Sequence, residues 1–302
     1  MLDTPVTTVE QSVSDAEVAA ANAQPGTVPP KRFSFFFWCC LGWLGLLAIV
    51  TIFAGMLHLD PPNAPYYTPI ATNAPPSFAH WLGTDDASRD VLSRLVYGAR
   101  VSLVIGLFGT AIGIGIGGSL GMFSAYVRGK IDAGLSFVMY IFLAFPAIIA
   151  VLCLLEFWGH TESHIVVILG LFSVPFIYRV TRAATLACAT KEYVTAARSQ
   201  GATARRVLAK DIFPNVIPAL IAYTVFTFGG IITTEGALGF LGQSVQIPIS
   251  SWGNMIGEAS GDLNATLVFI LAPASALFLT LVALNYAGEQ IRLRFDTSEQ
   301  KL

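Results

Sequence analysis

The sequence predicts an all-α integral membrane protein with six transmembrane helices. Of its 302 residues, 54% are hydrophobic and only 12% are charged, about half the roughly 25% charged fraction of a soluble domain. The mean hydropathy is +0.66. Such a chain has too little polar surface to shield a core from water, so we expect lipid to be its main solvent.

Six charge-free runs predict the six helices, because each is near the roughly 20 residues that cross the hydrocarbon core. They are residues 33–57, 101–127, 133–155, 163–178, 212–234 and 263–288. The fourth run is short, so its helix is expected to continue through Arg179 and Arg182, whose charged ends can reach the aqueous boundary. Four prolines inside the runs are candidate bends: Pro146, Pro175, Pro218 and Pro273.

A seventh charge-free run, 236–257, has a different composition. It holds five glycines, a proline, several polar residues and no charge. Non-helical backbone at membrane depth is tolerated only where protein or a water-filled cavity satisfies its amides. We therefore expect a loop or re-entrant hairpin that lines a cavity or packs against other parts of the protein.

The basic residues set the orientation. With the N-terminus inside, 14 of the 17 Lys and Arg residues fall on the inner side, which leaves Arg89, Arg94 and Arg100 outside. The positive-inside rule then makes both termini cytoplasmic. The net charge of −2 gives no reason to expect a nucleic-acid partner.

The second run carries a glycine every four residues, which places these glycines on one helical stripe where another helix can approach closely. They are Gly109, Gly113, Gly117 and Gly121. A formal GxGxxG pattern in the same run lacks a preceding strand, so a dinucleotide site is rejected. The sequence has no GxxxxGK[ST] pattern, so any ATP is expected to be hydrolysed by a partner. The four cysteines lie in apolar stretches without metal-ligand spacing, and we expect no metal or cofactor in this chain.

In the inner segment 191–215, we expect a helix over residues 192–200, which Gly201 interrupts. A short basic amphipathic stretch with Arg205 and Arg206 follows. It could lie among lipid headgroups or dock on a cytoplasmic protein. It resembles the EAA loop (about 189–214) of binding-protein-dependent ABC importer permeases. The matching residues are Ala196, Ala197, Gly201, Ile212 and Pro214. The segment departs from the family pattern at Thr195, where the family usually has Glu, and at Phe213, where it usually has Leu.

The outer segment 80–103 is similar to the signature that precedes the second helix in the dipeptide, oligopeptide and nickel branch of these permeases. The matching residues are Gly83, Thr84, Asp85, Arg89, Asp90, Ser93, Arg94, Gly98, Arg100 and Ser102. Ser88 stands where that branch commonly has Gly, so we expect the local turn to differ. Two later motifs also match, at Phe240, Leu241, Gly242, Ser251, Trp252 and Gly253, and at Asn285, Gly288, Glu289 and Arg292.

The resemblance implies a type I ABC importer permease fold with a cytoplasmic coupling helix, of the "C" type found in peptide importers. It implies a non-catalytic, multi-pass subunit of the bacterial inner membrane. The expected partners are a homologous permease (a heterodimer), two ATP-binding subunits that hold ATP and Mg, an extracytoplasmic substrate-binding protein, and membrane lipid. The expected organisation is a cytoplasmic tail (1–32), a first helix with an outer loop (33–98), a permease core (99–291) and a short cytoplasmic tail (292–302).

Two sets of site residues follow. On the inner side, Ala196, Ala197 and Gly201 are expected to form a close-packed docking surface for an ATPase, with charge complementarity from Arg205 and Arg206. On the outer side, a salt-bridged collar is expected to support the binding protein or shape the entrance, and the alternative is a solvated cap of weak exposed pairs. The collar residues are Asp85, Arg89, Asp90 and Arg94.

Glu235 and Trp252 complete the outer-side candidates. Glu235 follows a long charge-free run, and ionisable groups at such depth are functional candidates. It could meet a peptide's amino terminus, or have a structural role at the interface with outer water, which we favour.

Other functions remain open at this point. A nickel or other small-solute ABC permease shares the same motifs. A self-sufficient secondary transporter would usually show internal repeats, and a membrane enzyme would need a nucleophile arrangement. Neither is evident, and the four histidines, which lie in or beside outer loops, belong to no motif: His58, His80, His160 and His164.

Overall fold

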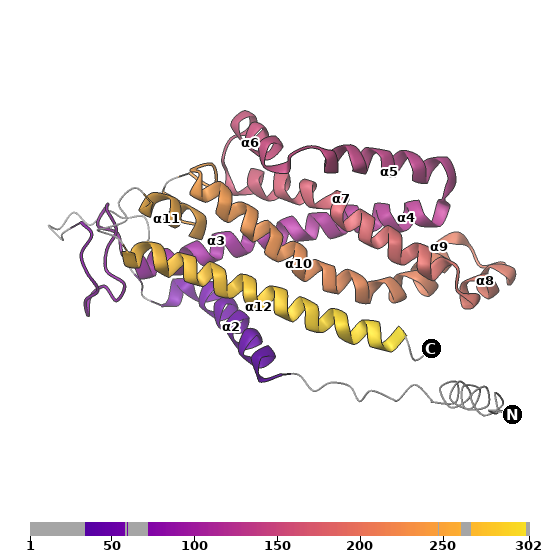
Figure 1. Cartoon of the computed structure of the whole chain (residues 1–302), viewed down its shortest axis with the longest axis horizontal. Helices are drawn as coiled ribbons and strands as arrows, with labels where there is room; N and C mark the ends of the chain where they lie inside the picture. Colours follow the sequence, from indigo (N-terminus) through magenta and orange to yellow (C-terminus); the bar gives the residue numbers. More distant parts are fainter. Residues whose placement is uncertain (1–33, 58, 60–71, 247, 261–266, 300–302) are drawn as a thin grey trace, which may run out of the picture. The chain divides into compact units, whose positions relative to one another are not determined.

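The structure is a computed structural model that describes residues 34–57, 59, 72–246, 248–260 and 267–299, with backbone only for 295–299 (Figure 1). The expected N-terminal tail, 1–32, lies outside the described residues. The described residues belong to one compact unit, 34–302. They are helical apart from loops and an isolated bridge between Thr84 and Asp90.

Five stretches are long and apolar enough to cross a membrane as helices. They are α2 (Phe35–Ile52), the continuous run of α3 (Val91–Ile112), η2 (Gly113–Gly118) and α4 (Ser119–Val127), then α7 (Glu162–Ala189), the run of α9 (Ala204–Arg206), η3 (Val207–Ile212) and α10 (Phe213–Phe240), and finally α12 (Leu267–Glu299). As expected, α7 continues through Arg179 and Arg182.

The sixth crossing is a pair of helices, α5 (Gly129–Ala144) and α6 (Ala147–Trp158), which meet at 86°. Pro146 lies at the break, and Phe145 before it is extended, with φ −83° and ψ 136°. Proline removes a backbone donor and disfavours helical geometry in the residue before it. Six crossings are thus confirmed if the bent pair counts as one span, but the third is not the single straight helix that the sequence predicted. Pro175, Pro218 and Pro273 instead lie inside helices.

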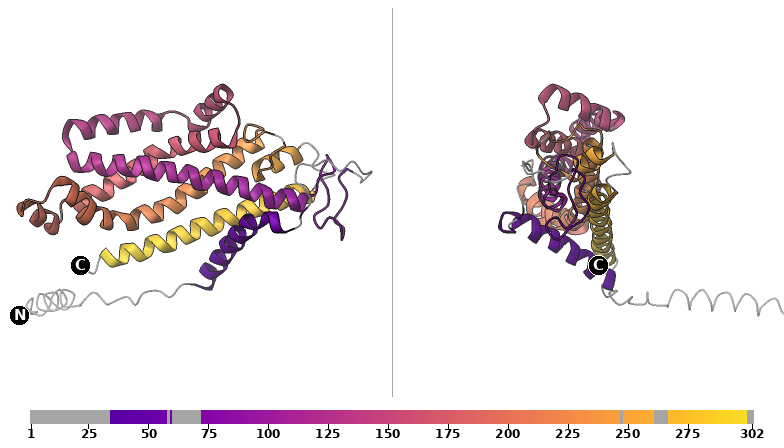
Figure 2. Two further views of the ribbon diagram at one scale, coloured as in Figure 1. Left: turned by 180° about the vertical axis from the view of Figure 1, so that it is seen from behind. Right: turned by 90° about the vertical axis from the view of Figure 1, so that its left-hand side faces the viewer.

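The centre of the bundle is α10, which packs against α3, α7, α11 (Trp252–Ala259) and α12. The first helix, α2, lies beside α12 in Figures 1 and 2 and also contacts α3. Buried aliphatic side chains fill the space between α3, α6, α7 and α10, among them Ile105, Leu155, Ile168 and Leu238.

The glycine stripe lies against α7. A Cβ added at Gly117 would be 2.5 Å from the carbonyl oxygen of Val174, and one at Gly121 would be 2.5 Å from that of Tyr178. Gly109 and Gly113 face the same helix, near Gly170 and Ser173. These backbones touch, so the α3–α4 run and α7 are held at a distance that only glycine permits.

The structure corrects the interpretation of the glycine-rich run 236–257. Its first five residues are the last turn of α10, and the described residues 241–246 and 248–251 lie between α10 and α11. The glycines mostly serve helix contact, because a Cβ at Gly239 would be 2.6 Å from the backbone of Gly253. The expected boundary at 98/99 falls inside α3, and the expected tail from 292 is helical as far as Glu299.

Candidate functional sites: an outer ion-pair cluster and an inner coupling segment

The outer cluster is built around Asp85, in the loop before α3. Asp85 is fully buried. One carboxylate oxygen accepts the backbone N–H groups of Ala87 (2.9 Å) and Arg89 (2.7 Å). The other accepts Nε of Arg89 and Nη1 of Arg94, both at 2.6 Å.

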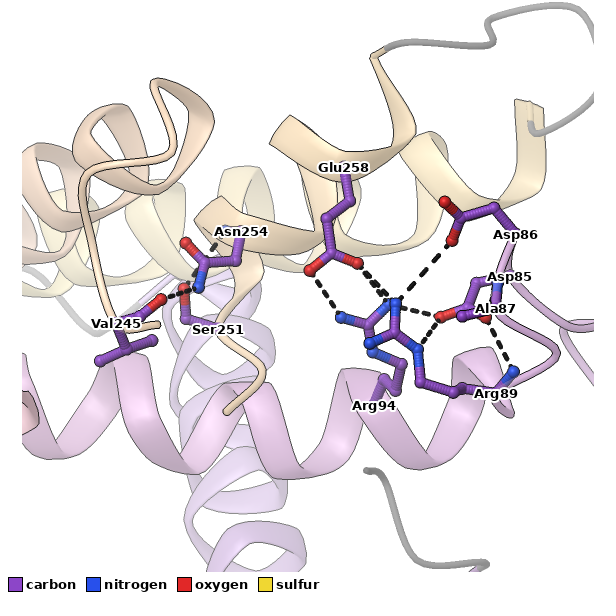
Figure 3. A network of polar contacts seen from close by, with 9 residues as sticks. All are labelled: Asp85, Asp86, Ala87, Arg89, Arg94, Val245, Ser251, Asn254 and Glu258. Atoms are coloured by element: carbon purple, nitrogen blue, oxygen red, sulfur yellow. Dashed lines mark hydrogen bonds and ion pairs between the residues drawn. The ribbon is translucent and has the colours of Figure 1, made fainter. Parts of the chain in front are cut away.

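Glu258, on α11, completes the cluster from the other side (Figure 3). Its carboxylate accepts Nη2 of Arg89 at 2.8 Å and contacts both terminal nitrogens of Arg94, at 2.9 and 3.0 Å. The Arg94 guanidinium also lies 5.6 Å from the ring centre of Phe269, on α12. Two carboxylates and two guanidinium groups therefore join α3, its preceding loop, α11 and α12.

The geometry corrects two expectations about the collar. The solvated cap of exposed pairs is wrong, because Asp85 and Arg94 are 0% exposed. Asp90 does not join the two arginines. Its carboxylate caps α3 by accepting the N–H of Ser93 at 2.7 Å and contacts His80 at 3.1 Å.

Sequence reasoning missed Glu258. The available signal is that it is the single charged residue between Glu235 and Asp262, on a stretch otherwise suited to membrane or protein interior. An isolated acid in such a stretch needs a cation, and Arg89 and Arg94 are two of the three outer cations.

The turn before Arg89 keeps the backbone that glycine favours. Ser88 has φ 61°, in the left-handed region. Ser88 therefore adopts a backbone conformation that glycine would reach without strain.

Glu235 lies inside the protein. It is 0% exposed, and its carboxylate accepts the hydroxyl of Ser102 on α3 at 2.9 Å and that of Ser244 at 2.8 Å. The expected place at the interface with outer water is wrong. The acid instead ties α10 to α3 and to the turn that precedes α11.

Trp252, at the start of α11, is also 0% exposed. Its indole donates to the carbonyl of Leu95 at 3.0 Å, and its backbone N–H donates to Ser102 at 3.4 Å. Asn254 anchors the same helix by donating to the carbonyl of Val245 (Figure 3). The side chain of Trp252 is thus buried within the protein, where it joins α11 to α3.

The inner coupling segment, which we define as α8 (Glu192–Ser199) through α9, is held on one side only. Val194 is fully buried in a hydrophobic cluster, against which Ala197 packs, as do Met122 and Tyr126 of α4. The guanidinium of Arg198 lies 4.7 Å from the ring centre of Tyr126, a contact that the sequence did not suggest. The remaining α8 side chains are exposed.

The predicted coupling residues divide by exposure. Five are exposed: Ala196, Gly201, Arg205, Arg206 and Pro214. Ala197 is half-buried and Ile212 is fully buried, so these two support the segment from within. Gly201 has φ 78° and open space around its Cα, so it ends α8 through its left-handed backbone rather than through a tight contact inside this chain.

Comparison with known proteins identifies the family of this chain. Residues 113–296 match the family described as binding-protein-dependent transport system inner membrane component. The chain belongs to this family. The matched region holds the coupling segment and Glu258, whereas Asp85, Arg89 and Arg94 precede it.

Individual relatives of the chain are also transport permeases. The chain is 32% identical over 254 residues to the glutathione transport system permease protein GsiD of Pectobacterium atrosepticum, covering 84% of each chain. It is 31% identical over 221 residues to the dipeptide transport system permease protein DppC of Alkalihalophilus pseudofirmus, covering 73% of each.

Among solved structures, an inward-facing form of the MetNI methionine ABC transporter has a chain that superposes with a TM-score of 0.57 at 21% identity, covering 67% of this chain and 96% of that one. This likeness confirms the type I importer permease fold. As a member of the family, the permease is a multi-pass protein of the bacterial inner membrane, and its family consists of non-catalytic transport subunits.

Proposed function

We propose that this permease is the "C" type subunit of an ATP-driven, binding-protein-dependent importer of dipeptides or other short peptides. The relatives named for dipeptide and glutathione transport support this cargo class. The substrate pathway forms between this chain and a homologous permease. Two partner ATPases hold ATP and Mg, and an extracytoplasmic protein delivers the peptide.

The observation that carries the proposal is the one-sided attachment of α8. A helix that lies on lipid needs an apolar face turned to the acyl chains. The apolar side of α8, with Val194 and Ala197, is turned into the protein instead, and small or polar residues such as Thr195, Ala196 and Ser199 are exposed. This surface suits a protein partner better than a membrane.

The contacts inside the chain provide a mechanical route away from α8. Arg198 stacks on Tyr126 of α4, and α4 meets α7 backbone to backbone at Gly121. Near the same end, Asp132 of α5 accepts two bonds of 2.6 Å from Arg182 of α7. Movement of α8 by a closing ATPase dimer therefore moves α4, α5 and α7 together.

The outer end receives this motion through α10, which packs on α7 and α3. The contacts of Gly239 with Gly253 and of Glu235 with Ser102 and Ser244 join α10 to α11 and α3. The outer ends of α3 and α11 are therefore expected to move together with α10.

Metal cargo is less well supported. Asp85, Asp86 and Glu258 could offer a ligand each, but Arg89 and Arg94 already neutralise two of these carboxylates. A cation entering this group would displace an arginine from a buried pair.

Reconstitution tests the proposal. The tagged chain is co-expressed with its partner permease and ATPases, purified, and placed in liposomes with binding protein and radiolabelled dialanine. Uptake is expected only when ATP and Mg are present on the side of the membrane that carries the ATPases, and only when every component is included. Uptake by this chain alone without ATP would overturn the proposal in favour of a secondary transporter.

A further inference from the structure

A cavity of about 400 Å³ lies between α3, the start of α7 and the turn before α11. Its volume is within the usual range of small-ligand sites. It is on the outer half of α3, since Arg100 lies nine positions after Val91. The cavity is lined by Tyr97, Arg100, Val101, Val104, Glu162, Ile249 and Ser250.

Two opposite charges line this cavity, Arg100 of α3 and Glu162 in the first turn of α7. Arg100 is exposed, Glu162 is half-buried, and neither side chain has an ion-pair or hydrogen-bond partner among the residues that the structure describes. Arg89 and Arg94, the other outer arginines, are both paired with carboxylates. An unpaired cation inside a spanning segment is costly and marks a pathway for ligands.

A third group points the same way. Ser250 is 3% exposed and its hydroxyl is buried without a hydrogen-bond partner. Buried hydroxyls are nearly always satisfied, so an orphan beside a cavity indicates a missing partner. The cavity thus combines one donor cation, one acceptor anion and one free hydroxyl.

An apolar cavity of about 490 Å³ adjoins this one, because Arg100 and Val104 line both. Its other walls are mostly aliphatic or aromatic, including Leu47, Leu103 and Phe228 from three different helices. A ligand whose charged ends occupy the first cavity can place a hydrophobic side chain in the second.

We propose that the Arg100–Glu162 cavity is a transit site for the two charged ends of a short zwitterionic peptide. The carboxylate pairs with Arg100, the ammonium group pairs with Glu162, and the Ser250 hydroxyl bonds the peptide amide. This assignment rests on the peptide importer proposed above and adds the residues and the charge pattern that select the cargo inside the membrane.

The test uses the complete complex in proteoliposomes with radiolabelled dialanine and, separately, its N-acetyl and C-amide derivatives. Arg100→Gln is expected to lower dialanine transport by about tenfold or more, since bonds to charged groups are the stronger ones. The same variant changes transport of the C-amide much less, because that peptide has no carboxylate. Glu162→Gln shows the mirror pattern with the N-acetyl peptide.

Two further variants separate charge recognition from folding. Arg100→Lys keeps the charge and is expected to retain most dialanine transport. The swap Arg100→Glu with Glu162→Arg is expected to recover transport relative to either single change, because a peptide can bind in reverse. Glu156→Gln is the matched control, since Glu156 is an outer acid with an 81% exposed side chain that does not line this cavity.

Several outcomes would overturn the inference. One is transport that neither Arg100→Gln nor Glu162→Gln alters. Another is a loss that is equal for free and capped peptides. If the loss instead depends on the phosphatidylethanolamine content of the liposomes, the cavity holds a zwitterionic lipid headgroup and the peptide assignment is wrong. If the wild-type complex moves no peptide with ATP, the proposed function fails as well.

Discussion

The outer cluster and the inner coupling segment carry their charges in opposite ways. Asp85 and Arg94 are fully buried and paired with each other and with neighbouring groups. Arg205 and Arg206 are exposed and have no ion-pair partner among the described residues. The charges of the outer cluster are satisfied within this chain, whereas those of Arg205 and Arg206 are available to another protein.

This contrast separates charges that stabilise the fold of this chain from charges that can contact another protein. A buried pair holds its own helices together but becomes very costly when one partner is removed. An exposed charge contributes little to the fold, so it can serve recognition. The outer cluster therefore holds α3, α11 and α12 together, and the exposed charges of the coupling segment fit the ATPase interface that we propose.

The largest expected effect comes from breaking the outer cluster. Asp85→Ala leaves Arg94 with a buried, undercompensated charge, and we expect it to lower the free energy of unfolding by about 3–5 kcal/mol. Denaturant unfolding in detergent measures this. Asp86→Ala is the matched control, because the Asp86 side chain is 63% exposed and 3.8 Å from Arg89, and it should cost under about 1 kcal/mol. Equal effects of the two changes would refute a buried cluster.

Next in size is the contact between α4 and α7. Gly121→Leu would force a side chain against the Tyr178 carbonyl, and overpacking of this kind costs about 1–3 kcal/mol or more. Gly115→Leu, at a glycine with nothing within 4 Å of an added Cβ, should be close to neutral. Thermal unfolding of both variants provides the comparison. A Gly121→Leu protein as stable as Gly115→Leu would mean that these helices do not touch.

A smaller effect is expected on the inner side. Replacing both Arg205 and Arg206 by Gln should weaken ATPase binding about three- to tenfold at low salt, and the difference should shrink at high salt because exposed charges are screened. Stability should not change. Binding is measured by titration of the purified ATPase, with Lys130→Gln as an exposed inner cation outside the segment. A difference that persists at 1 M salt would argue against charge complementarity.

The smallest effect concerns the turn at Ser88. Because φ is 61° there, Ser88→Gly should change stability by less than about 1 kcal/mol, while the β-branched Ser88→Val should cost about 1–2 kcal/mol. Thermal unfolding of the two variants side by side reads out the difference. If Val were tolerated as well as Gly, the left-handed turn would be wrong.

The sequence predicted most of the fold, because membrane helices are specified locally. Charge-free length, the bias of basic residues and the glycine spacing all report on single helices. Pro146 predicts where the helix is interrupted. It does not predict the 86° angle between α5 and α6, because that angle depends on what α6 packs against. The end of α10 was misread because glycines that serve helix contact look like those of a loop.

The sites were less predictable, because their pairings join distant segments. Arg89 meets Glu258 across 169 residues, and Glu235 meets Ser102 across 133. Motif matching pointed to Asp85, Arg89 and Arg94 but could not show burial, which reverses their meaning from an exposed collar to an internal cluster. Ala197 and Ile212 likewise match the coupling motif yet face inward, a distinction that only packing shows.

The most direct measurement of the central claim compares Ala196→Trp with wild type in the purified complex. Ala196 is exposed on α8, so a bulky side chain there leaves the fold intact but separates the coupling segment from the ATPase. Ala79→Trp, at an exposed alanine on the outer side, controls for size. We predict that Ala196→Trp unfolds at the wild-type temperature, loses ATPase co-purification and lowers ATP-driven peptide uptake at least tenfold, while Ala79→Trp keeps the ATPase. Wild-type co-purification and uptake by the Ala196→Trp complex would contradict a coupling role for α8.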